Sequence, residues 1–219
     1  MSYEWNGKRY DLGYFFMDPV AYVVGVETGI GPVDYVTEAL GGGRVLVCFL
    51  SLVDAHIEGM LRAKPGLRYF VYEARSLSPR YFLNSQGELY AMLHLGWSMA
   101  EGRLILREDG GPRRFAAPWS KLIDDRAPIT FDVHAAALSL LDRIYEHAGL
   151  FAWRETCESV RTMDCRDLPK LATQAIRMAQ PATWPNGTGE SDAALFDVEF
   201  RQWHVVTRAI AEGVPMNDG

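Results

Sequence analysis

The stretch RVLVCFLSL, residues 44–52, decides the fold expected from this sequence. It is an almost continuous apolar run, which is typical of a strand buried on both faces. VDAHIEGMLRAK, residues 53–64, predicts a helix because its apolar residues recur at helical spacing and Pro65-Gly66 follows. LRYFVYEA, residues 67–74, predicts another strand. Strand, helix and strand in succession indicate an α/β layer.

Upstream, residues 3–12 predict a hairpin around Asn6-Gly7, and residues 20–26 predict a strand. The following VETGIGPVDYV, residues 26–36, resembles part of a phosphate-binding loop. However, the third position of a dinucleotide fingerprint holds Asp34 instead of glycine, and Glu27 adds a second negative charge. We therefore interpret the stretch as a turn that starts a short helix from Pro32 to Leu40.

Downstream, turn residues at 84–87 and 109–111 predict antiparallel strand pairs that extend the sheet. ELYAMLHLGWSMAEG, residues 88–102, is expected to be a helix because of its length and its Leu, Met and Ala content. A solvated hairpin is the interpretation of the local arginine cluster, which comprises Arg103, Arg107, Arg113 and Arg114.

The last third of the chain has helical periodicity. Helices are expected at 132–149, where Asp132 is a candidate cap, and at 151–163 and 168–179. A loop at 181–192 precedes a predicted final helix with one aromatic face, made of Phe196, Phe200, Trp203, Val206 and Ile210. The expected fold is therefore α+β. A mixed β-sheet with short helices occupies residues 1–130, and an all-helical half, residues 131–219, packs against it as one compact unit.

Composition and charge exclude several classes of protein. The chain has 219 residues, a formal net charge of -6 and a pI near 5.4, which argues against a sequence-independent nucleic-acid binder. No apolar run is long enough for a membrane span and no secretion signal opens the sequence, so a cytoplasmic location is expected. Cys48, Cys157 and Cys165 form no disulfide framework, although Cys157 and Cys165 could pair in an oxidising compartment.

The sequence contains no complete catalytic or metal-binding motif. The five histidines lack the spacing of a metal site, and no paired-cysteine motif or nucleophile elbow occurs, so no cofactor or metal is expected. Ser51, Asp54 and His56 lie near a strand end, where α/β sheets place their chemistry. Residues so close in sequence rarely assemble a triad, and Asp54 is interpreted as a helix cap.

These observations predict a non-enzymatic, acidic binding protein that acts through a protein-protein surface. An immunity or toxin-neutralising protein with a basic protein partner is a concrete version. Trp119 and Trp184 are included among the contact residues because they lie in or next to predicted loops. The candidate contact residues are Glu27, Asp34, Trp119, Asp124, Asp125 and Trp184.

Two alternatives remain open. One is a small-molecule or nucleotide-binding α/β enzyme that uses the loop ends at 27–34 and 51–56. The other is a structural subunit whose final aromatic face forms an oligomer contact. An enzyme needs a deep pocket with converging polar groups, whereas a neutralising protein needs an exposed acidic or aromatic patch.

Overall fold

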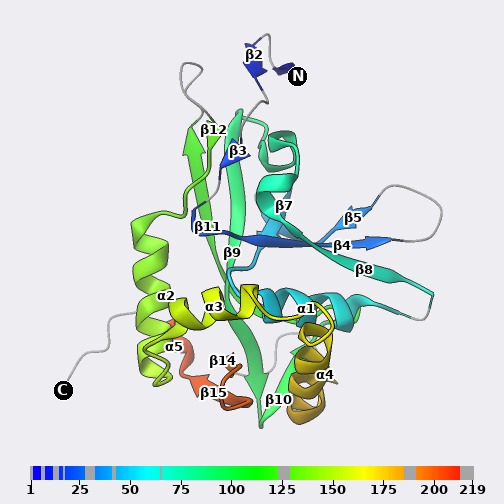
Figure 1. The fold of residues 1–219 in the computed structure, drawn as a ribbon, viewed down its shortest axis with the longest axis vertical. Coiled ribbons are helices and arrows are strands. Elements are labelled where there is room, and N and C mark those ends of the chain that lie inside the picture. Colours follow the sequence, from blue (N-terminus) through cyan, green and yellow to red (C-terminus); the bar gives the residue numbers. More distant parts are fainter. Residues whose placement is uncertain are drawn as a thin grey trace.

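The computed structural model describes residues 2–5, 8–11, 15–16, 18–27, 33–40, 43–64, 66–122, 129–184 and 191–212. Within these ranges, β-sheets combine with α-helices, which confirms the predicted α+β class (Figure 1). None of the helices in these ranges is long and apolar enough to cross a membrane.

The long strand β9 (Glu88–Ala100) organises the main sheet. Four strands pair with it directly: β7 (Gly43–Cys48) in parallel, and β10 (Arg103–Leu106), β11 (Arg114–Leu122) and β14 (Asp192–Asp197) in antiparallel orientation. Three outer strands pair with β7, β10 and β14 respectively: β6 (Thr37–Leu40), β13 (Ala182–Thr183) and β15 (Gln202–Val206).

Smaller sheets surround this one. A three-stranded sheet has the order β5 (Asp34–Tyr35), β4 (Tyr22–Glu27), β8 (Arg68–Glu73). The predicted opening hairpin is confirmed by the antiparallel pair β1 (Ser2–Trp5) and β2 (Lys8–Asp11), and Asn6-Gly7 lies outside the described residues. The last pair is β3 (Phe15–Phe16) with β12 (Ile129–Thr130). The strands predicted at 20–26, 44–52 and 67–74 are β4, β7 and β8.

The helices of the described chain are α1 (Leu52–Arg62), α2 (Ala135–His147), α3 (Trp153–Arg161), α4 (Leu168–Ala179) and the short α5 (Arg208–Ala211). Two 3-10 turns, η1 (Ala74–Ser76) and η2 (Pro79–Phe82), precede β9. Helices α2 to α4 lie inside the predicted segments, and α1 begins at Leu52, one residue before its predicted segment. Both predicted caps are wrong. Ser51 caps α1 because its Oγ accepts a hydrogen bond from the Asp54 amide at 3.1 Å, and the N-cap position of α2 is His134.

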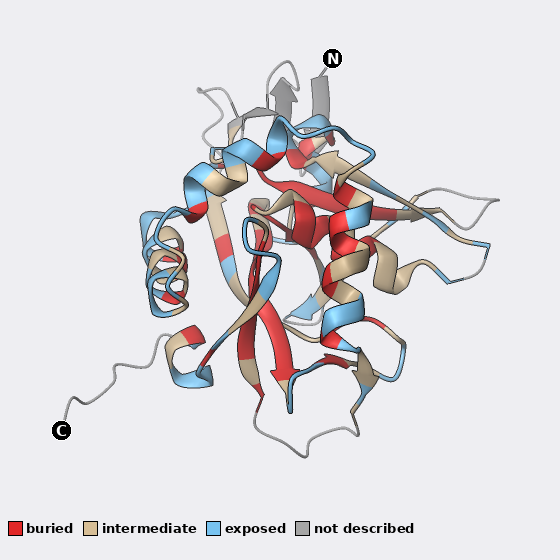
Figure 2. Ribbon diagram, turned by 60° about the horizontal axis from the view of Figure 1, so that its bottom comes forward, coloured by how far each residue is buried: buried red, intermediate tan, exposed pale blue. Residues whose placement is uncertain are grey.

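Two hydrophobic cores lie on opposite faces of the main sheet. One contains Leu89, Leu93 and Trp119 and is covered by α2. The other contains Trp97 and Met99 and is covered by α1 and α4. Figure 2 shows buried residues concentrated along the central strands, whereas the helices alternate between buried and exposed residues.

The helix predicted for residues 88–102 is wrong, because the segment is β9. The strand contains a bulge at Leu95, since Phe115 pairs with Gly96 and the next residue, Ala116, pairs with His94. Before the bulge the odd-numbered Leu93 faces the first core, and after it the odd-numbered Trp97 faces the second. Both faces are buried and the alternation reverses midway, so the sequence shows neither strand nor helix periodicity clearly.

The helix predicted from Pro32 to Leu40 is also wrong, because its described part forms β5 and β6. Pairing with distant strands decides this: the Val36 amide donates to the Val24 carbonyl, and the Val36 carbonyl accepts from the Val47 amide. The glycine loop at 28–32 lies outside the described residues.

The predicted final helix is replaced by the β14–β15 hairpin and α5, and β13 lies within the predicted loop at 181–192. Residues 131–219 are therefore not all helical. The cause is visible in the hairpin register, where Phe196 pairs directly with Trp203. Aromatic residues seven positions apart match two helical turns, and they also match facing positions of a hairpin with a four-residue turn.

Candidate functional site

The predicted contact residues that the structure describes lie on different elements. Glu27 ends β4, and Asp34 is exposed on β5, where it pairs with Val26 beside Glu27. Trp184 is partly buried, and its amide donates to the Leu106 carbonyl at 3.3 Å. Asp124 and Asp125 lie outside the described residues.

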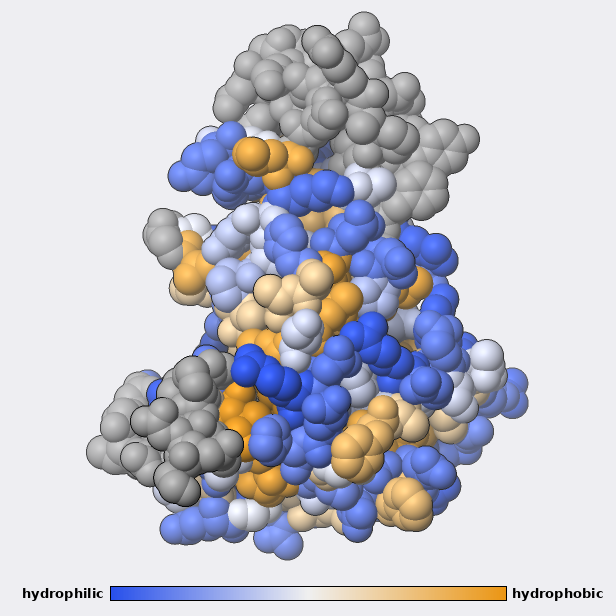
Figure 3. Space-filling view, turned by 90° about the vertical axis from the view of Figure 1, so that its left-hand side faces the viewer, coloured by the Kyte–Doolittle hydropathy of each residue, from blue (hydrophilic) through white to orange (hydrophobic). Residues whose placement is uncertain are grey.

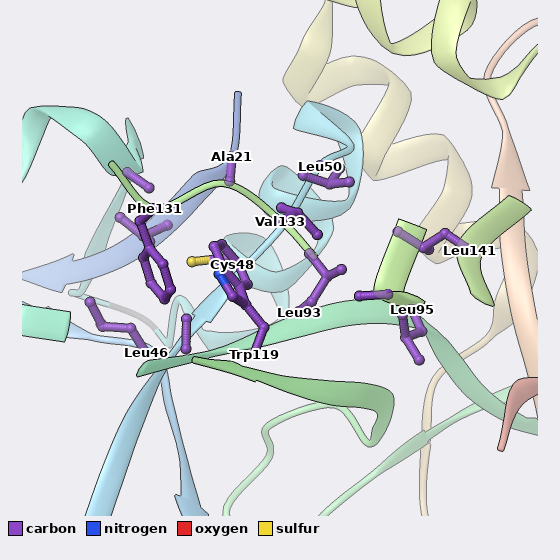
Figure 4. Close-up of a cluster of buried hydrophobic side chains, with 14 of the residues drawn as sticks. Ala21, Leu46, Cys48, Leu50, Leu93, Leu95, Trp119, Phe131, Val133 and Leu141 are labelled. Carbon is purple, nitrogen blue, oxygen red and sulfur yellow. The ribbon is translucent and has the colours of Figure 1, made fainter. Parts of the chain in front are cut away.

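The prediction that Trp119 lies beside a loop is wrong. Trp119 belongs to β11 and is 1% exposed. It lies in the first core with Phe131, Cys48 and Leu93 (Figure 4), and the Trp119 and Phe131 ring centroids are 4.2 Å apart. Trp119 is therefore a core residue and offers no surface to a partner.

Ser51, Asp54 and His56 have separate partners instead of forming a triad. Ser51 caps α1, and the buried Asp54 carboxylate accepts a hydrogen bond from Trp97 Nε1 at 2.8 Å. His56 Nδ1 lies 3.1 Å from the Tyr69 hydroxyl. Burial raises the pKa of Asp54 to about 6, because few groups replace the water that would solvate its charge.

The arginine cluster is not a solvated hairpin, because the Arg114 side chain is only 2% exposed. Its Nη2 lies 2.8 Å from Oε1 of Glu58, which has no exposed side-chain surface, and Arg62 Nε binds the same oxygen at 2.5 Å. Glu38 joins from β6, with Oε1 at 3.4 Å from Arg114 Nε and Oε2 at 2.9 Å from Arg107 Nη1. These five residues, the Arg114 network, join α1 to the main sheet.

A different region has the properties of a binding site. A cavity of about 410 Å³ lies between the start of α1, the helices α2 and α3, and the turn of the β14–β15 hairpin. This volume falls within the usual range of ligand pockets. Its lining is mainly apolar and includes Leu150, Phe151, Trp153, Val160, Phe196 and Phe200. On the face that carries α2, hydrophobic side chains are visible in separate groups among hydrophilic ones (Figure 3).

The end of α2 places Phe151 at this cavity. The helix stops at Gly149, which has a φ of +77°, a value that favours glycine. The amides of Gly149 and Leu150 donate to the carbonyls of Glu146 and Tyr145, and these bonds fix the turn. Phe151 follows and is 77% exposed.

The β14–β15 turn places Phe200 at the same cavity. Asp197 Oδ1 accepts hydrogen bonds from the amides of Glu199 at 2.9 Å and Phe200 at 3.1 Å. Arg201 completes the turn with a φ of +54°. Phe200 is 72% exposed, although its turn is held by the buried Asp197.

The polar side of the cavity is formed by the same hairpin. Asp197 is 6% exposed, and its Oδ2 lies 3.4 Å from His204 Nε2. That nitrogen also lies 3.1 Å from Gln202 Nε2. Asp197, Glu199 and His204 are the ionisable hairpin residues that line the cavity, and its described lining contains no lysine or arginine.

The opposite wall carries Tyr145 and Cys157. The Tyr145 ring stacks on Trp153 with centroids 4.8 Å apart, and burial raises the Tyr145 pKa well above its ordinary value. Burial also raises the pKa of Cys157 to about 12, so its thiol stays protonated near neutral pH. A thiolate is the nucleophilic form of cysteine. This wall therefore contributes packing surface and hydrogen-bonding groups, and its Cys157 thiol is not activated as a nucleophile.

Little in the sequence indicates this site. The predicted helix stop at Gly149 is confirmed, and the apolar Leu150 and Phe151 that follow it are the one local signal. The helical spacing of Phe200 with Phe196 and Trp203 conceals the turn that exposes it. The proximity of Asp197 and His204 depends on the hairpin and has no local signal.

No family model matches the chain, and no curated protein or solved structure matches it either. Within the described part of the chain, no group of three or more His, Cys, Asp or Glu side chains is placed to hold a metal ion. Cys157 and Cys165 are both free thiols.

Proposed function

We propose that this is a binding protein that recognises a protein partner through Phe151, Phe200 and the cavity that both residues line. We call this region the Phe151–Phe200 surface. The observation that carries the proposal is that two turns from different parts of the chain present largely exposed phenylalanines to one cavity. Large aromatic side chains beside a pocket are typical anchors of protein interfaces.

The energetics favour association. A phenylalanine can bury about 150 Å² or more in an interface, which at about 25 cal/mol per Å² corresponds to roughly 3–4 kcal/mol before the costs of binding. Those costs are reduced here because hydrogen bonds already hold both turns, through Gly149 and through Asp197. The surface is organised before a partner arrives.

The net charge of -6 supports a basic partner, because complementary charge accelerates encounter. That the partner is a toxin, neutralised on binding, stays a prediction about its identity. The alternative enzyme would use the loop ends at 27–34 and 51–56. Ser51 and Leu52 line the cavity, whereas the described residues of the other loop end, among them Glu27 and Asp34, are not part of its lining.

The proposal is tested with a Phe151→Ser/Phe200→Ser variant. Tagged wild-type and variant proteins are incubated with an extract of the organism that encodes the chain, and bound proteins are quantified. We expect a stoichiometric partner of the wild type to bind the variant at least about 100-fold more weakly, because two anchors are lost.

Leu122→Ser provides the matched control, because Leu122 is also apolar and 74% exposed but lies on β11 away from the cavity lining. It should retain the partner. If the wild type captures no specific partner, or all three proteins capture it equally, the Phe151–Phe200 surface is not the interface.

A further inference from the structure

The charge of the cavity indicates what a partner would place there. Two acidic residues of the hairpin, Asp197 and Glu199, line it together with His204. No lysine or arginine of the described lining balances them. A cation that enters the cavity would gain a carboxylate partner, whereas an anion would find no lysine or arginine in the described lining.

Asp197 is the group best placed to receive this cation. Its Oδ1 accepts hydrogen bonds from the amides of Glu199 and Phe200. Among the described residues, its Oδ2 has the longer 3.4 Å approach to His204 Nε2 as its contact with a charged or ionisable group. The side chain is 6% exposed, so water screens the charge far less than at the surface. A short charge-assisted hydrogen bond to Oδ2 would therefore be stronger than the present contact.

The molecule already contains the arrangement that such a cation would adopt. On α3, the Arg154 guanidinium lies over the Trp153 ring, 4.9 Å from its centroid, and its Nη2 lies 2.8 Å from Asp142 Oδ2. Aromatic ring, guanidinium and carboxylate thus form one contact. The hairpin side of the cavity lining has the same two kinds of group, the aromatic rings of Phe196 and Phe200 and the carboxylate of Asp197.

We infer that the cavity accepts an arginine or lysine side chain of the partner, next to an apolar side chain that packs on Phe151 and Phe200. This inference rests on the proposed function and adds the chemistry of the recognised segment. The basic group would bind Asp197 Oδ2, and its aliphatic stem would lie along the aromatic walls.

The inference is tested with short peptides, so that no knowledge of the partner is needed. Acetyl-phenylalanyl-arginine amide is titrated into the full chain and followed by amide NMR signals. Acetyl-phenylalanyl-citrulline amide has the same shape without the charge. We expect the arginine peptide to shift signals of residues 149–151 and 197–204, and to bind roughly tenfold more tightly than the citrulline peptide.

The Asp197→Asn variant removes the negative charge but keeps the turn, because the amide oxygen can still accept the hydrogen bonds that Oδ1 accepts from the Glu199 and Phe200 amides. In this variant the two peptides should bind equally. Equal binding of both peptides to the wild type would overturn the inference without any variant, so it does not depend on folding of Asp197→Asn. Shifts confined to other regions would overturn it too.

The two proposals can fail separately. If the Phe151→Ser/Phe200→Ser variant loses its partner but neither peptide binds, the interface stands and the cationic occupant is wrong. If the arginine peptide binds preferentially but no protein partner depends on the phenylalanines, the cavity chemistry stands and the protein-binding function is wrong.

Discussion

Helix α1 connects two regions that differ in how far their charges are matched by charges of opposite sign. Toward its C-terminal end, Glu58 and Arg62 belong to the Arg114 network, where buried charges of both signs contact each other. At its N-terminal end, Ser51 borders a cavity whose described lining includes two hairpin carboxylates, no lysine or arginine, and two exposed phenylalanines. In the Arg114 network, buried charges of opposite sign hold secondary-structure elements together. The cavity is partly apolar and its carboxylates are not matched by cations of its described lining, so it is suited to binding a group of another molecule.

The network is balanced in charge but imperfect in hydrogen bonding. Glu58 Oε2 and Arg114 Nη1 are buried without a hydrogen-bond partner in the described part of the chain. An apolar replacement of an entire buried ion network can be neutral or stabilising, but removal of one member leaves a buried charge uncompensated. The comparison therefore predicts a large stability effect in the network and a small one at the cavity mouth.

The largest expected effect comes from Arg114→Met. The substitution keeps an apolar stem of similar length but leaves Glu58, which has no exposed side-chain surface, with Arg62 alone. We expect a loss of about 3–5 kcal/mol in the free energy of unfolding, measured by urea denaturation.

Arg154→Met is the control for that loss, because Arg154 is 48% exposed and its partner Asp142 is 38% exposed. It should change the free energy of unfolding by less than about 1 kcal/mol. Similar losses in the two variants would show that burial does not distinguish the Arg114 network from a surface ion pair.

A smaller, pH-dependent effect is expected from Asp54→Asn. The fold raises the pKa of Asp54 from 3.8 to about 6, so its stabilising contribution is complete below about pH 4 and is lost as the pH rises through about 6. Asparagine does not ionise and can still accept the Trp97 Nε1 hydrogen bond. The stability of the variant relative to wild type should therefore increase by up to about 3 kcal/mol between about pH 4 and about pH 8.

Urea denaturation of both proteins at several pH values measures this difference. Groups that titrate equally in the two proteins cancel, so the difference reports Asp54. If the stability of Asp54→Asn minus that of the wild type is constant across the pH range, burial does not destabilise the Asp54 carboxylate. If this difference decreases as the pH rises, folding lowers the pKa of Asp54.

Local pattern was sufficient for parts of this fold. Helix α1 and strands β7 and β8 were predictable from local features: α1 has helical periodicity, β7 lies in a continuous apolar run, and β8 is rich in residues that favour strands. Strand β9 was not, since the bulge at Leu95 reverses its faces and its partners come from distant segments. The turn at Asp197 was also missed, because Phe196 and Trp203 fit a helix and a hairpin equally well.

The site was less predictable than the fold. Phe151, Asp197 and Phe200 lie on two turns about fifty residues apart in sequence, and no short motif connects them. Trp119 is a predicted contact residue because it lies next to a predicted loop and its indole N-H needs a hydrogen-bond partner. Its burial depends on β11 pairing along β9, which its immediate neighbours in the sequence do not indicate.

The central claim is that the Phe151–Phe200 surface contacts a protein partner, and site-specific photo-crosslinking tests it most directly. Photoreactive benzoyl-phenylalanine is placed at position 200, at position 151 or, as a control, at the exposed position 122 in the encoding organism. The account predicts the same discrete protein adduct from positions 200 and 151 and none from position 122. The absence of an adduct at 200 and 151, or an equal adduct at 122, would contradict it.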